Sequence, residues 1–310
     1  MNLKKIAILG TGGTIAGRAS NAFDNVGYAA AQLGIAQLLV DIPPLAEGGP
    51  IISEQIMQID SKDMSFAVWQ QLAQRVNHFL ACDDVQGIVI THGTDTLEET
   101  AYFLQAVCRP AKPVVLTCAM RPATALAPDG PQNVLDALAV ARHAGASGVV
   151  AVCAGTIHGA IDVQKVHSYK LDAFSSGDAG PIGYVEEGSL RLVRNWPVGQ
   201  AVLAHAAIEK VAKWPRVEII MSYAGASGAI AQALLDQGID GLVVAATGNG
   251  TVHHDLQDAL LKAQAAGVRV VRATRCINGR VIPVPNDSIA DCNGLSPVKA
   301  RVALILELMA

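Results

Sequence analysis

Short apolar blocks alternate with longer amphipathic stretches along most of this chain. The apolar blocks predict strands at residues 4–9, 51–59, 87–91, 113–117 and 148–153. Between them, residues 64–80 place apolar side chains every three or four positions, which predicts a helix with Asp63 as its N-cap. Thr96 and Glu99 predict a capping box for a helix that ends near 108, and a further helix is expected near 131–144. This alternation predicts a mostly parallel sheet with helices on both faces.

The alternation stops between about 155 and 212, where Gly, Ser, Asp and Pro are frequent, and then resumes. Further strands are predicted at 216–222, 241–247 and 268–274, and helices near 226–238, 253–266 and 297–308. Ser296 and Pro297 are suited to the N-cap and first position of the last helix. We therefore predict two α/β domains, over residues 1–190 and 213–310, with a linker over 191–212.

Composition narrows the classes of protein to consider. Of 310 residues, 51% are hydrophobic and 16% are charged, and the net charge is −4. Apolar runs of ~18 residues are missing, so we expect no membrane span. Lys and Arg form no stripe, so nucleic acid is not an expected partner. The six cysteines lack metal-ligand spacing and the first residues lack a signal-peptide pattern, which favours reduced, buried thiols in a cytoplasmic protein.

The first predicted strand leads into the glycine-rich segment TGGTIAG (11–17). A Rossmann fingerprint needs a small residue where Ile15 stands, and a P-loop needs Lys and a hydroxyl residue where Arg18 and Ala19 stand. A nucleotide site is therefore disfavoured. What remains is the hydroxyl of Thr14 at the carboxyl edge of the predicted sheet. Taken alone, Thr14 is better explained as a residue that caps a turn.

A second polar motif, ITHGTDTLEET (90–100), follows another strand of the same predicted sheet. It places Thr91, Thr94, Asp95 and Thr96 just before a predicted helix N-terminus. Free backbone N–H groups and the positive end of the helix dipole suit a carboxylate or a developing oxyanion there. Hydroxyl and carboxylate groups at one edge of the sheet therefore predict a catalytic or binding site.

TGGTIAG together with THGTDTLEETAYFL (91–104) resembles the bacterial-type L-asparaginase family, which comprises amidohydrolases of asparagine and glutamine. Supporting matches are IDSKDM (59–64), KPVVLTCAMRP (112–122), DGPQN (129–133), DVQK (162–165), ATGNG (246–250) and SPVKAR (296–301). The second stretch and the closing one resemble the type II branch more than the allosteric cytoplasmic branch. The resemblance implies a larger N-terminal, mostly parallel sheet flanked by helices and a smaller C-terminal flavodoxin-like parallel-sheet domain.

The resemblance also implies amide hydrolysis in two steps through an acyl-enzyme. Thr14 is then the nucleophile, and Tyr28 contacts it from the loop that follows Gly17. The composition of that loop is typical of a mobile lid. Thr94, Asp95 and Lys165 match the second catalytic group of the family, in which a lysine, a carboxylate and a hydroxyl share protons.

Substrate contacts are implied in the same way. Asp95 pairs with the α-ammonium group of the substrate and Ser61 holds its α-carboxylate, while the backbone N–H groups of Gly13 and Thr94 are candidates for the oxyanion site. Further substrate-binding positions implied by the resemblance are Lys62, Ala119 and Asn249. Because Asn249 matches a residue that reaches a partner chain, we expect a homodimer or homotetramer.

Two departures from the family pattern affect substrate preference. Lys62 stands where the type II branch usually has Gln, and its flexible cation is expected to face the α-carboxylate. Residues 281–292 lack the Glu that reaches a neighbouring subunit's site in the family. Asp287 and Asp291 lie nearby, but neither can be assigned to that role from the sequence.

The resemblance implies no metal and no organic cofactor. His253 and His254 precede Asp255, and a solvated helix start explains them better than a metal site does; His92 is expected to be structural. The leading hypothesis is an L-asparaginase with possible glutaminase side activity. The alternatives are a related amidohydrolase acting on glutamine, a tRNA-linked glutamine or an acyl ester, and a binding module that has lost catalysis.

Overall fold

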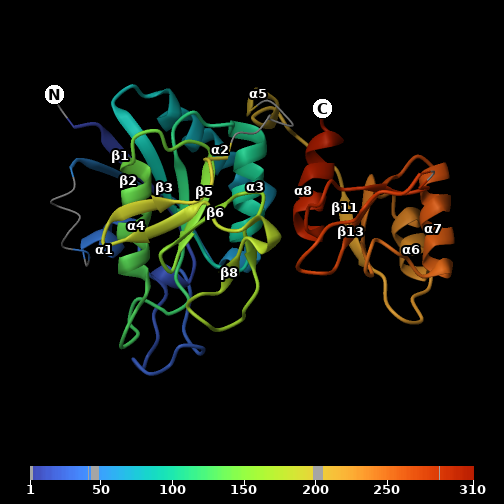
Figure 1. Ribbon diagram of the computed structural model, residues 1–310, viewed down its shortest axis with the longest axis horizontal. Helices are drawn as coiled ribbons and strands as arrows, with labels where there is room; N and C mark the ends of the chain where they lie inside the picture. Colours follow the sequence, from blue (N-terminus) through green and yellow to red (C-terminus); the bar gives the residue numbers. More distant parts are fainter. Residues whose placement is uncertain (1–2, 41, 43–48, 198–204, 286) are drawn as a thin grey trace. The chain divides into compact units, whose positions relative to one another are not determined.

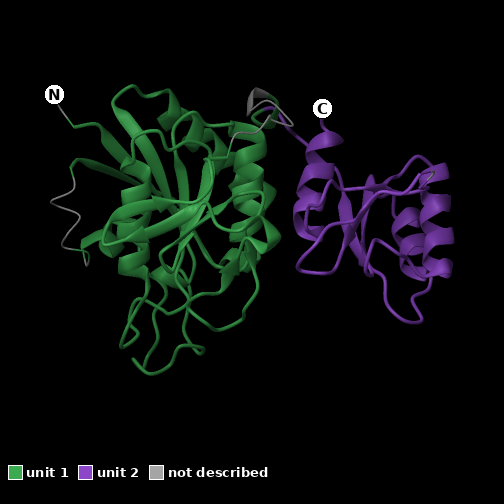
Figure 2. Ribbon diagram, viewed as in Figure 1, with its two compact units in different colours: residues 1–209 green, residues 210–310 purple. Residues whose placement is uncertain are grey.

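The computed structural model describes residues 3–40, 42, 49–197, 205–285 and 287–310. The chain divides into two compact units, residues 1–209 and residues 210–310, shown in green and purple in Figure 2. The division falls inside the predicted linker of residues 191–212, of which residues 198–204 lie outside the described residues. Each unit contains its own sheet.

The N-terminal unit is built on an eight-stranded sheet with the order β10-β9-β6-β5-β4-β3-β1-β2. Its parallel part consists of β1 (Lys5–Gly12), β2 (Ile51–Ile59), β3 (Val85–Thr91), β4 (Val114–Thr117) and β5 (Val149–Cys153). Three antiparallel strands extend it beyond β5, namely β6 (Thr156–Gly159), β9 (Gly183–Glu186) and β10 (Ser189–Leu192). The predicted mostly parallel sheet is therefore confirmed.

The parallel strands follow the order β2-β1-β3-β4-β5, so the direction of the strand order reverses between β1 and β3. This is the flavodoxin-like order. Loops that leave the carboxyl ends of the strands on the two sides of such a reversal lead away from each other and leave a crevice between them. Here these are the loops after Gly12 and Thr91, which contain the two polar motifs.

Helices cover both faces of this sheet (Figure 1). They are α1 (Ile35–Val40), α2 (Phe66–Ala81), α3 (Leu97–Cys108) and α4 (Gly130–Arg142), followed by the short α5 (His205–Ile208). Alternate residues of a strand face opposite sides of a sheet. Accordingly Ile6 and Ile8 of β1 pack with Leu38 of α1 and Val134 of α4 in one core cluster, while α2 and α3 pack on the other face. Each of the described helices is too short or too polar to span a bilayer.

Two predicted helix starts require correction. Ser65, rather than Asp63, is the N-cap of α2, and its hydroxyl accepts the Val68 N–H at 3.4 Å. Asp63 instead belongs to a preceding 3₁₀ turn. At α3, Thr96 is the N-cap but forms no capping hydrogen bond, because its hydroxyl donates to the Ser61 carbonyl at 2.8 Å. A tertiary contact has thus replaced the capping bond predicted for the Thr96 hydroxyl.

Residues 155–212, where the alternation of apolar blocks and amphipathic stretches stops, contain short strands. Besides β6, β9 and β10, they form the two-residue strands β7 (Gln164–Lys165) and β8 (Phe174–Ser175), which pair as an antiparallel hairpin. Strands of two to four residues are too short to produce a readable period in the sequence. Lys165, one of the predicted catalytic residues, lies on this hairpin.

The C-terminal unit contains four parallel strands in the order β11-β12-β13-β14. They are β11 (Val217–Met221), β12 (Gly241–Ala246), β13 (Arg269–Thr274) and β14 (Ala290–Asp291), with α6 (Ala229–Asp236), α7 (His254–Ala265) and α8 (Pro297–Glu307). Apolar residues of α6 and α7 form a core with the sheet, and α8 packs against β11, β12 and β13. Ser296 is the predicted N-cap of α8, although its side chain makes no capping hydrogen bond. The smaller parallel-sheet domain is confirmed.

Candidate active site

Three chain segments meet at the strand-order reversal because glycines let their backbones approach. A Cβ atom on Gly13 would lie 2.3 Å from the Gly93 Cα, and one on Gly93 would lie 2.4 Å from the Ser61 Oγ. Gly13 also has a φ of 80°, which an L side chain rarely adopts. The two glycine-containing motifs and the turn after β2 therefore form one packed unit, and larger residues at these positions would separate them.

Thr14 lies in a 3₁₀ turn directly after β1 and forms the first hydroxyl group of the site. Its side chain is nearly buried, and its Oγ1 lies 2.5 Å from the Tyr28 Oη. The Tyr28 ring packs over Gly17, where a Cβ atom would lie 2.9 Å from a ring carbon. Burial raises the pKa of Tyr28 despite its hydrogen bond to Thr14. The phenol is therefore neutral near pH 7.

The segment that contains Tyr28 leaves the core at Gly17 and lies at the lower end of the N-terminal unit in Figure 1, coloured blue. Its base is closed by two backbone hydrogen bonds between Arg18 and Ala29. Ala19 N–H donates to the Thr124 hydroxyl at 2.8 Å, which attaches the segment to the loop after β4. We call residues 17–29 the lid.

Thr94, Asp95 and Lys165 form the second group. The Lys165 Nζ donates to the Thr94 Oγ1 at 2.8 Å and to the Asp95 Oδ1 at 2.6 Å. The lysine side chain is 19% exposed and the aspartate side chain 51% exposed. A mostly buried ammonium is stabilised by such a partner, and one face of the carboxylate stays open to solvent. The predicted association of these three residues is therefore present.

Both groups line one cavity of about 190 Å³. Its lining consists of Thr14, Asn25, Val26, Tyr28, Asp60, Ser61, Thr94, Asp95, Met120, Lys165, Ser168 and Tyr169. Sequence reasoning missed Asn25, Val26, Asp60, Met120, Ser168 and Tyr169. Asp60 was recoverable from its position beside Ser61 at the end of a strand. The other five lie in irregular loops, where position along the chain says little about proximity.

The loop containing Met120 is shaped by a residue of the DGPQN motif. The Asp129 carboxylate accepts the N–H of Met120 and that of Arg121, each at 2.9 Å. Asn133 donates to the Cys118 carbonyl at 2.9 Å and so links α4 to the same loop. The motif therefore positions the cavity wall without lining the cavity.

The backbone around Thr94 is fixed from the buried side. His92 is fully buried; its Nδ1–H donates to the Gly93 carbonyl at 2.7 Å, and its Nε2 accepts from the Thr100 hydroxyl at 3.0 Å. Burial lowers the pKa of His92 to about 4, so the ring is neutral. Carbonyl and N–H point in opposite directions in a trans peptide, so the Thr94 N–H points away from this ring.

The two predicted oxyanion donors thus differ. The Gly13 N–H donates to the Ile59 carbonyl at 2.9 Å and is already used within the fold. The Asp95 N–H donates to the Ser61 Oγ at 3.2 Å, which fixes the serine beside the second group. Of the two predicted donors, the geometry favours Thr94 over Gly13.

Three predicted substrate-binding residues lie elsewhere. The Lys62 side chain is 62% exposed, does not line the cavity, and its ammonium pairs with Asp60 and Asp63 at 3.2 and 3.0 Å. Ala119 is buried in the core under the sheet. Asn249 belongs to the C-terminal unit, where its amide exchanges hydrogen bonds of 3.1 and 2.7 Å with the Ile282 backbone. Their substrate contacts stay predictions, and the geometry does not favour the one assigned to Lys62.

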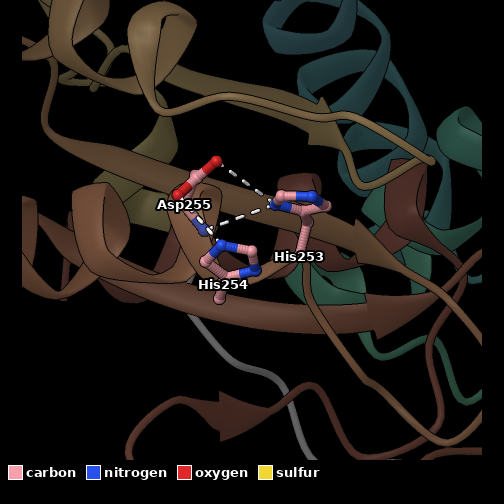
Figure 3. A group of neighbouring side chains, drawn as sticks. All are labelled: His253, His254 and Asp255. Atoms are coloured by element: carbon pink, nitrogen blue, oxygen red, sulfur yellow. Dashed lines mark hydrogen bonds and ion pairs between the residues drawn. The ribbon is translucent and has the colours of Figure 1, made fainter.

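His253, His254 and Asp255 are the one described cluster in which three possible metal ligands converge (Figure 3). The His253 Nδ1 accepts the Asp255 N–H at 3.3 Å and so caps α7, and the His254 Nε2 lies 3.2 Å from the Asp255 carboxylate. His254 is 82% exposed. The positive end of a helix dipole opposes a cation here, so helix capping explains the cluster better than a metal does.

The cysteines supply no nucleophile to the cavity. All six are free thiols, and the cavity lining contains none of them. Cys118 and Cys153 lie at the ends of β4 and β5 with their sulfurs 3.3 Å apart, and the pKa of Cys118 is raised by its hydrogen bond to Cys153 and by burial. A thiol in this state is unreactive.

Comparisons with known proteins agree with this architecture. The family model described as "Asparaginase, N-terminal" matches residues 5–198, and the "Glutaminase/Asparaginase C-terminal domain" matches residues 216–310. The chain is 36% identical over 313 residues to L-asparaginase 2 of Escherichia coli (strain K12), covering 99% of this chain and 89% of that protein. It is also 36% identical to glutaminase-asparaginase of Pseudomonas fluorescens biotype A, covering 99% and 86% of the two chains.

The crystal structure of a probable cytoplasmic L-asparaginase from Campylobacter jejuni superposes with a TM-score of 0.93 at 39% identity, covering 98% of this chain and 95% of that one. The fold, the site and these relatives define an amidohydrolase of the asparaginase–glutaminase class. The chain belongs to the bacterial-type L-asparaginase family.

Proposed function

We propose that this protein is an L-asparaginase that hydrolyses the side-chain amide of asparagine to aspartate and ammonia through an acyl-enzyme on Thr14. The observation that carries the proposal is one cavity lined by two separately supported hydroxyl groups, those of Thr14 and Thr94. One hydroxyl has a phenol as its partner and the other has a lysine and a carboxylate. Two hydroxyl groups suit two half-reactions, acylation and hydrolysis.

In the first half-reaction, the Thr14 Oγ1 attacks the amide carbon of the substrate side chain. The hydroxyl proton is transferred through the hydrogen-bonded groups of the cavity to the amide nitrogen, the C–N bond breaks, and ammonia leaves. The Tyr28 Oη, 2.5 Å from the Thr14 Oγ1, orients the hydroxyl as a neutral hydrogen-bond partner. The Thr94 N–H is the candidate donor to the oxyanion, and the support for this role is that the carbonyl of the same peptide is bound to His92 on the buried side.

In the second half-reaction, water attacks the ester carbon, the bond to Thr14 breaks, and the threonine regains its proton as aspartate is released. The Thr94–Lys165–Asp95 group is the candidate for accepting the proton of this water, because the three side chains share short hydrogen bonds. General acid–base assistance of this kind typically contributes 10²–10⁴-fold in rate, roughly. The scheme needs neither a metal nor an organic cofactor.

Substrate selection follows from the charges that line the cavity. The carboxylates of Asp95 and Asp60 suit an α-ammonium group, and the Ser61 hydroxyl suits an α-carboxylate. A tRNA-linked glutamine keeps the α-ammonium group but has an ester in place of the α-carboxylate, so it lacks the charge that the Ser61 hydroxyl would meet. The tRNA-linked alternative is therefore less favoured than asparagine or glutamine.

Glutaminase activity is the second candidate function, because one relative is named glutaminase-asparaginase. Ammonia release measured with asparagine and glutamine side by side tests both. We expect kcat/KM to be higher for asparagine, and peptide mass analysis of a quenched reaction should find the acyl group on Thr14. Turnover of glutamine alone would replace the proposed substrate, and no turnover of either would overturn the function.

We further propose an active homodimer or homotetramer in which Asn249 reaches the site of a partner chain. The support is the family resemblance of the ATGNG segment and the exposure of Asn249 in the C-terminal unit. Mixing inactive Thr14→Ala chains with inactive Asn249→Ala chains should restore some activity, because one hybrid site then has neither change. No recovery after verified subunit exchange would mean that each chain builds its own site.

The cytoplasmic location stays a prediction. One relative is named cytoplasmic and another, from Haemophilus influenzae, is named periplasmic. Fractionation of cells that produce the full chain, followed by ammonia assays on each fraction, tests it. Activity released with the periplasmic fraction would contradict the prediction.

A further inference from the structure

The β7–β8 hairpin builds one wall of the cavity in addition to presenting Lys165. The paired strands continue into a backbone hydrogen bond from Val166 N–H to the Ala173 carbonyl at 2.8 Å. Beyond this bond lies the hairpin tip, which we define as residues 167–172. Its Ser168 and Tyr169 line the same cavity as Asn25 and Val26 of the lid.

One side chain holds the backbone of this tip. The His167 Nδ1 accepts the N–H of Tyr169 and that of Lys170, each at 3.0 Å. Both bonds require a lone pair on Nδ1, so the ring carries its proton on Nε2. A residue that binds the N–H groups two and three positions ahead shapes a turn as an Asx side chain does. His167 does this with its ring in place of a carboxylate or amide.

Within the tip, the structure describes one further hydrogen bond, from the His167 N–H to the Ala173 carbonyl at 3.2 Å, and this bond lies at the base of the tip. Tyr169 is 60% exposed, and Ser168 and Lys170 are also exposed. An exposed tip without its two acceptor bonds would sample more conformations. A substrate that needs the wall would then have to order it on binding, at a cost in conformational entropy.

We propose that His167 is a positioning residue for substrate binding, which fixes Ser168 and Tyr169 as a wall of the cavity. This inference rests on the proposed asparaginase function. His167 does not itself line the cavity. It affects the substrate by fixing the cavity wall, and it leaves Thr14 and the Thr94–Lys165 group in place. A change at His167 should therefore alter KM and leave kcat nearly unchanged.

The test compares three variants by steady-state kinetics with asparagine. His167→Ala removes the acceptor and should raise KM by about 3- to 10-fold while kcat stays within about twofold. His167→Asn retains an acceptor suited to the same turn and should restore KM to within about twofold of the parent. Lys170→Ala is the matched control in the same tip, because its side chain does not line the cavity. It should leave both constants unchanged.

A double-variant cycle tests whether the histidine acts through the wall. Tyr169→Ala should raise KM, and adding His167→Ala to it should raise KM no further, because the wall is already lost. Additive effects would overturn the proposal. So would an unchanged KM in His167→Ala, or a failure of His167→Asn to restore it.

Hydrogen exchange separates this inference from the proposed function. The amides of Tyr169 and Lys170 should exchange faster in His167→Ala and regain protection in His167→Asn, whether or not the protein hydrolyses asparagine. Equal exchange in all forms would overturn the role of His167 even in an active asparaginase. If the three forms show the expected exchange pattern but the parent does not hydrolyse asparagine, the role of His167 stands and the proposed function is overturned.

Discussion

The two halves of the cavity each present a threonine beside a glycine, but they support it differently. Tyr28, the partner of Thr14, lies on the lid, which is closed at its base by the bridge between Arg18 and Ala29. The partners of Thr94 are its chain neighbour Asp95 and Lys165 of a paired hairpin. The hydroxyl of Thr14 is therefore supported by a residue of a surface loop, whereas the hydroxyl of Thr94 is supported by its chain neighbour and by a residue of a paired hairpin.

This difference corresponds to the chemistry proposed for each half. The site around a nucleophile must admit substrate and release product. A loop that carries the hydrogen-bond partner of the nucleophile can open for both steps. A proton-holding group works best when its geometry does not change, and His92 with Thr100 fixes the Thr94 segment from inside the protein. Removing groups from each half should separate these roles.

The largest effect is expected from Thr14→Ala. Turnover of asparagine should fall by at least about 10³-fold, since loss of a nucleophile commonly removes several orders of magnitude in rate. The melting curve should stay close to the parental one, because the change removes only one hydroxyl and one methyl at a nearly buried position. Thr14→Ser is the control and should retain part of the activity. Near-parental turnover of Thr14→Ala with unchanged melting would mean that Thr14 is not the nucleophile.

Changes in the second half should also abolish turnover, but they should differ in binding. Lys165→Met removes the cation held 2.8 Å from Thr94 and leaves Asp95 able to meet an α-ammonium group. Asp95→Ala removes that partner and leaves a mostly buried ammonium unpaired. Calorimetry with asparagine should detect weak binding to Lys165→Met and none to Asp95→Ala. Equal binding by the two variants would contradict the division of roles.

A smaller loss is expected from Tyr28→Phe, which keeps the ring over Gly17 and removes only the hydroxyl. We expect kcat to fall by about 10²-fold. Burial raises the pKa of Tyr28 above its ordinary value of 10.0, so the neutral phenol persists to alkaline pH and is lost only as the pH rises past that raised value. Loss of the substrate α-ammonium charge lowers kcat/KM in both forms at a lower pH. The part of the decline that belongs to Tyr28 should appear above pH 10 in the parent and be absent from Tyr28→Phe. If that part appears in both forms, it belongs to another group.

The smallest effect is expected from Lys62→Gln. Its ammonium pairs with Asp60 at the cavity margin, so its removal leaves the carboxylate more negative toward an α-ammonium group. KM for asparagine should fall, by no more than about threefold because the lysine is exposed and screened by solvent. The sequence alone favoured the opposite sign, with the cation at the α-carboxylate. A rise in KM measured at low ionic strength would restore that earlier interpretation.

The sequence was sufficient for the longer strands and helices and for the identity of the two polar motifs, but not for α1 or the short strands β6 to β10. Strands buried on both faces are continuous apolar blocks, and helices such as α2 and α7 keep a 3.6-residue period, so both are visible without a structure. TGGTIAG and THGTDT also follow strands, and the carboxyl ends of parallel strands share one edge of a sheet. Local chemistry and strand order along the chain were thus enough to predict that Thr14, Thr94 and Asp95 meet.

Only the tertiary structure decided which neighbours these residues have. Lys62 and Asp60 are two positions apart, yet one faces solvent and the other lines the cavity, because a 3₁₀ turn directs them differently. The Gly13 N–H cannot serve as the predicted oxyanion donor because it already donates to the Ile59 carbonyl of the neighbouring strand. Ser168 and Tyr169 joined the wall through a hairpin tip shaped by His167. Such contacts depend on turn geometry and on pairs of residues far apart in the chain, which hydrophobic periodicity does not encode.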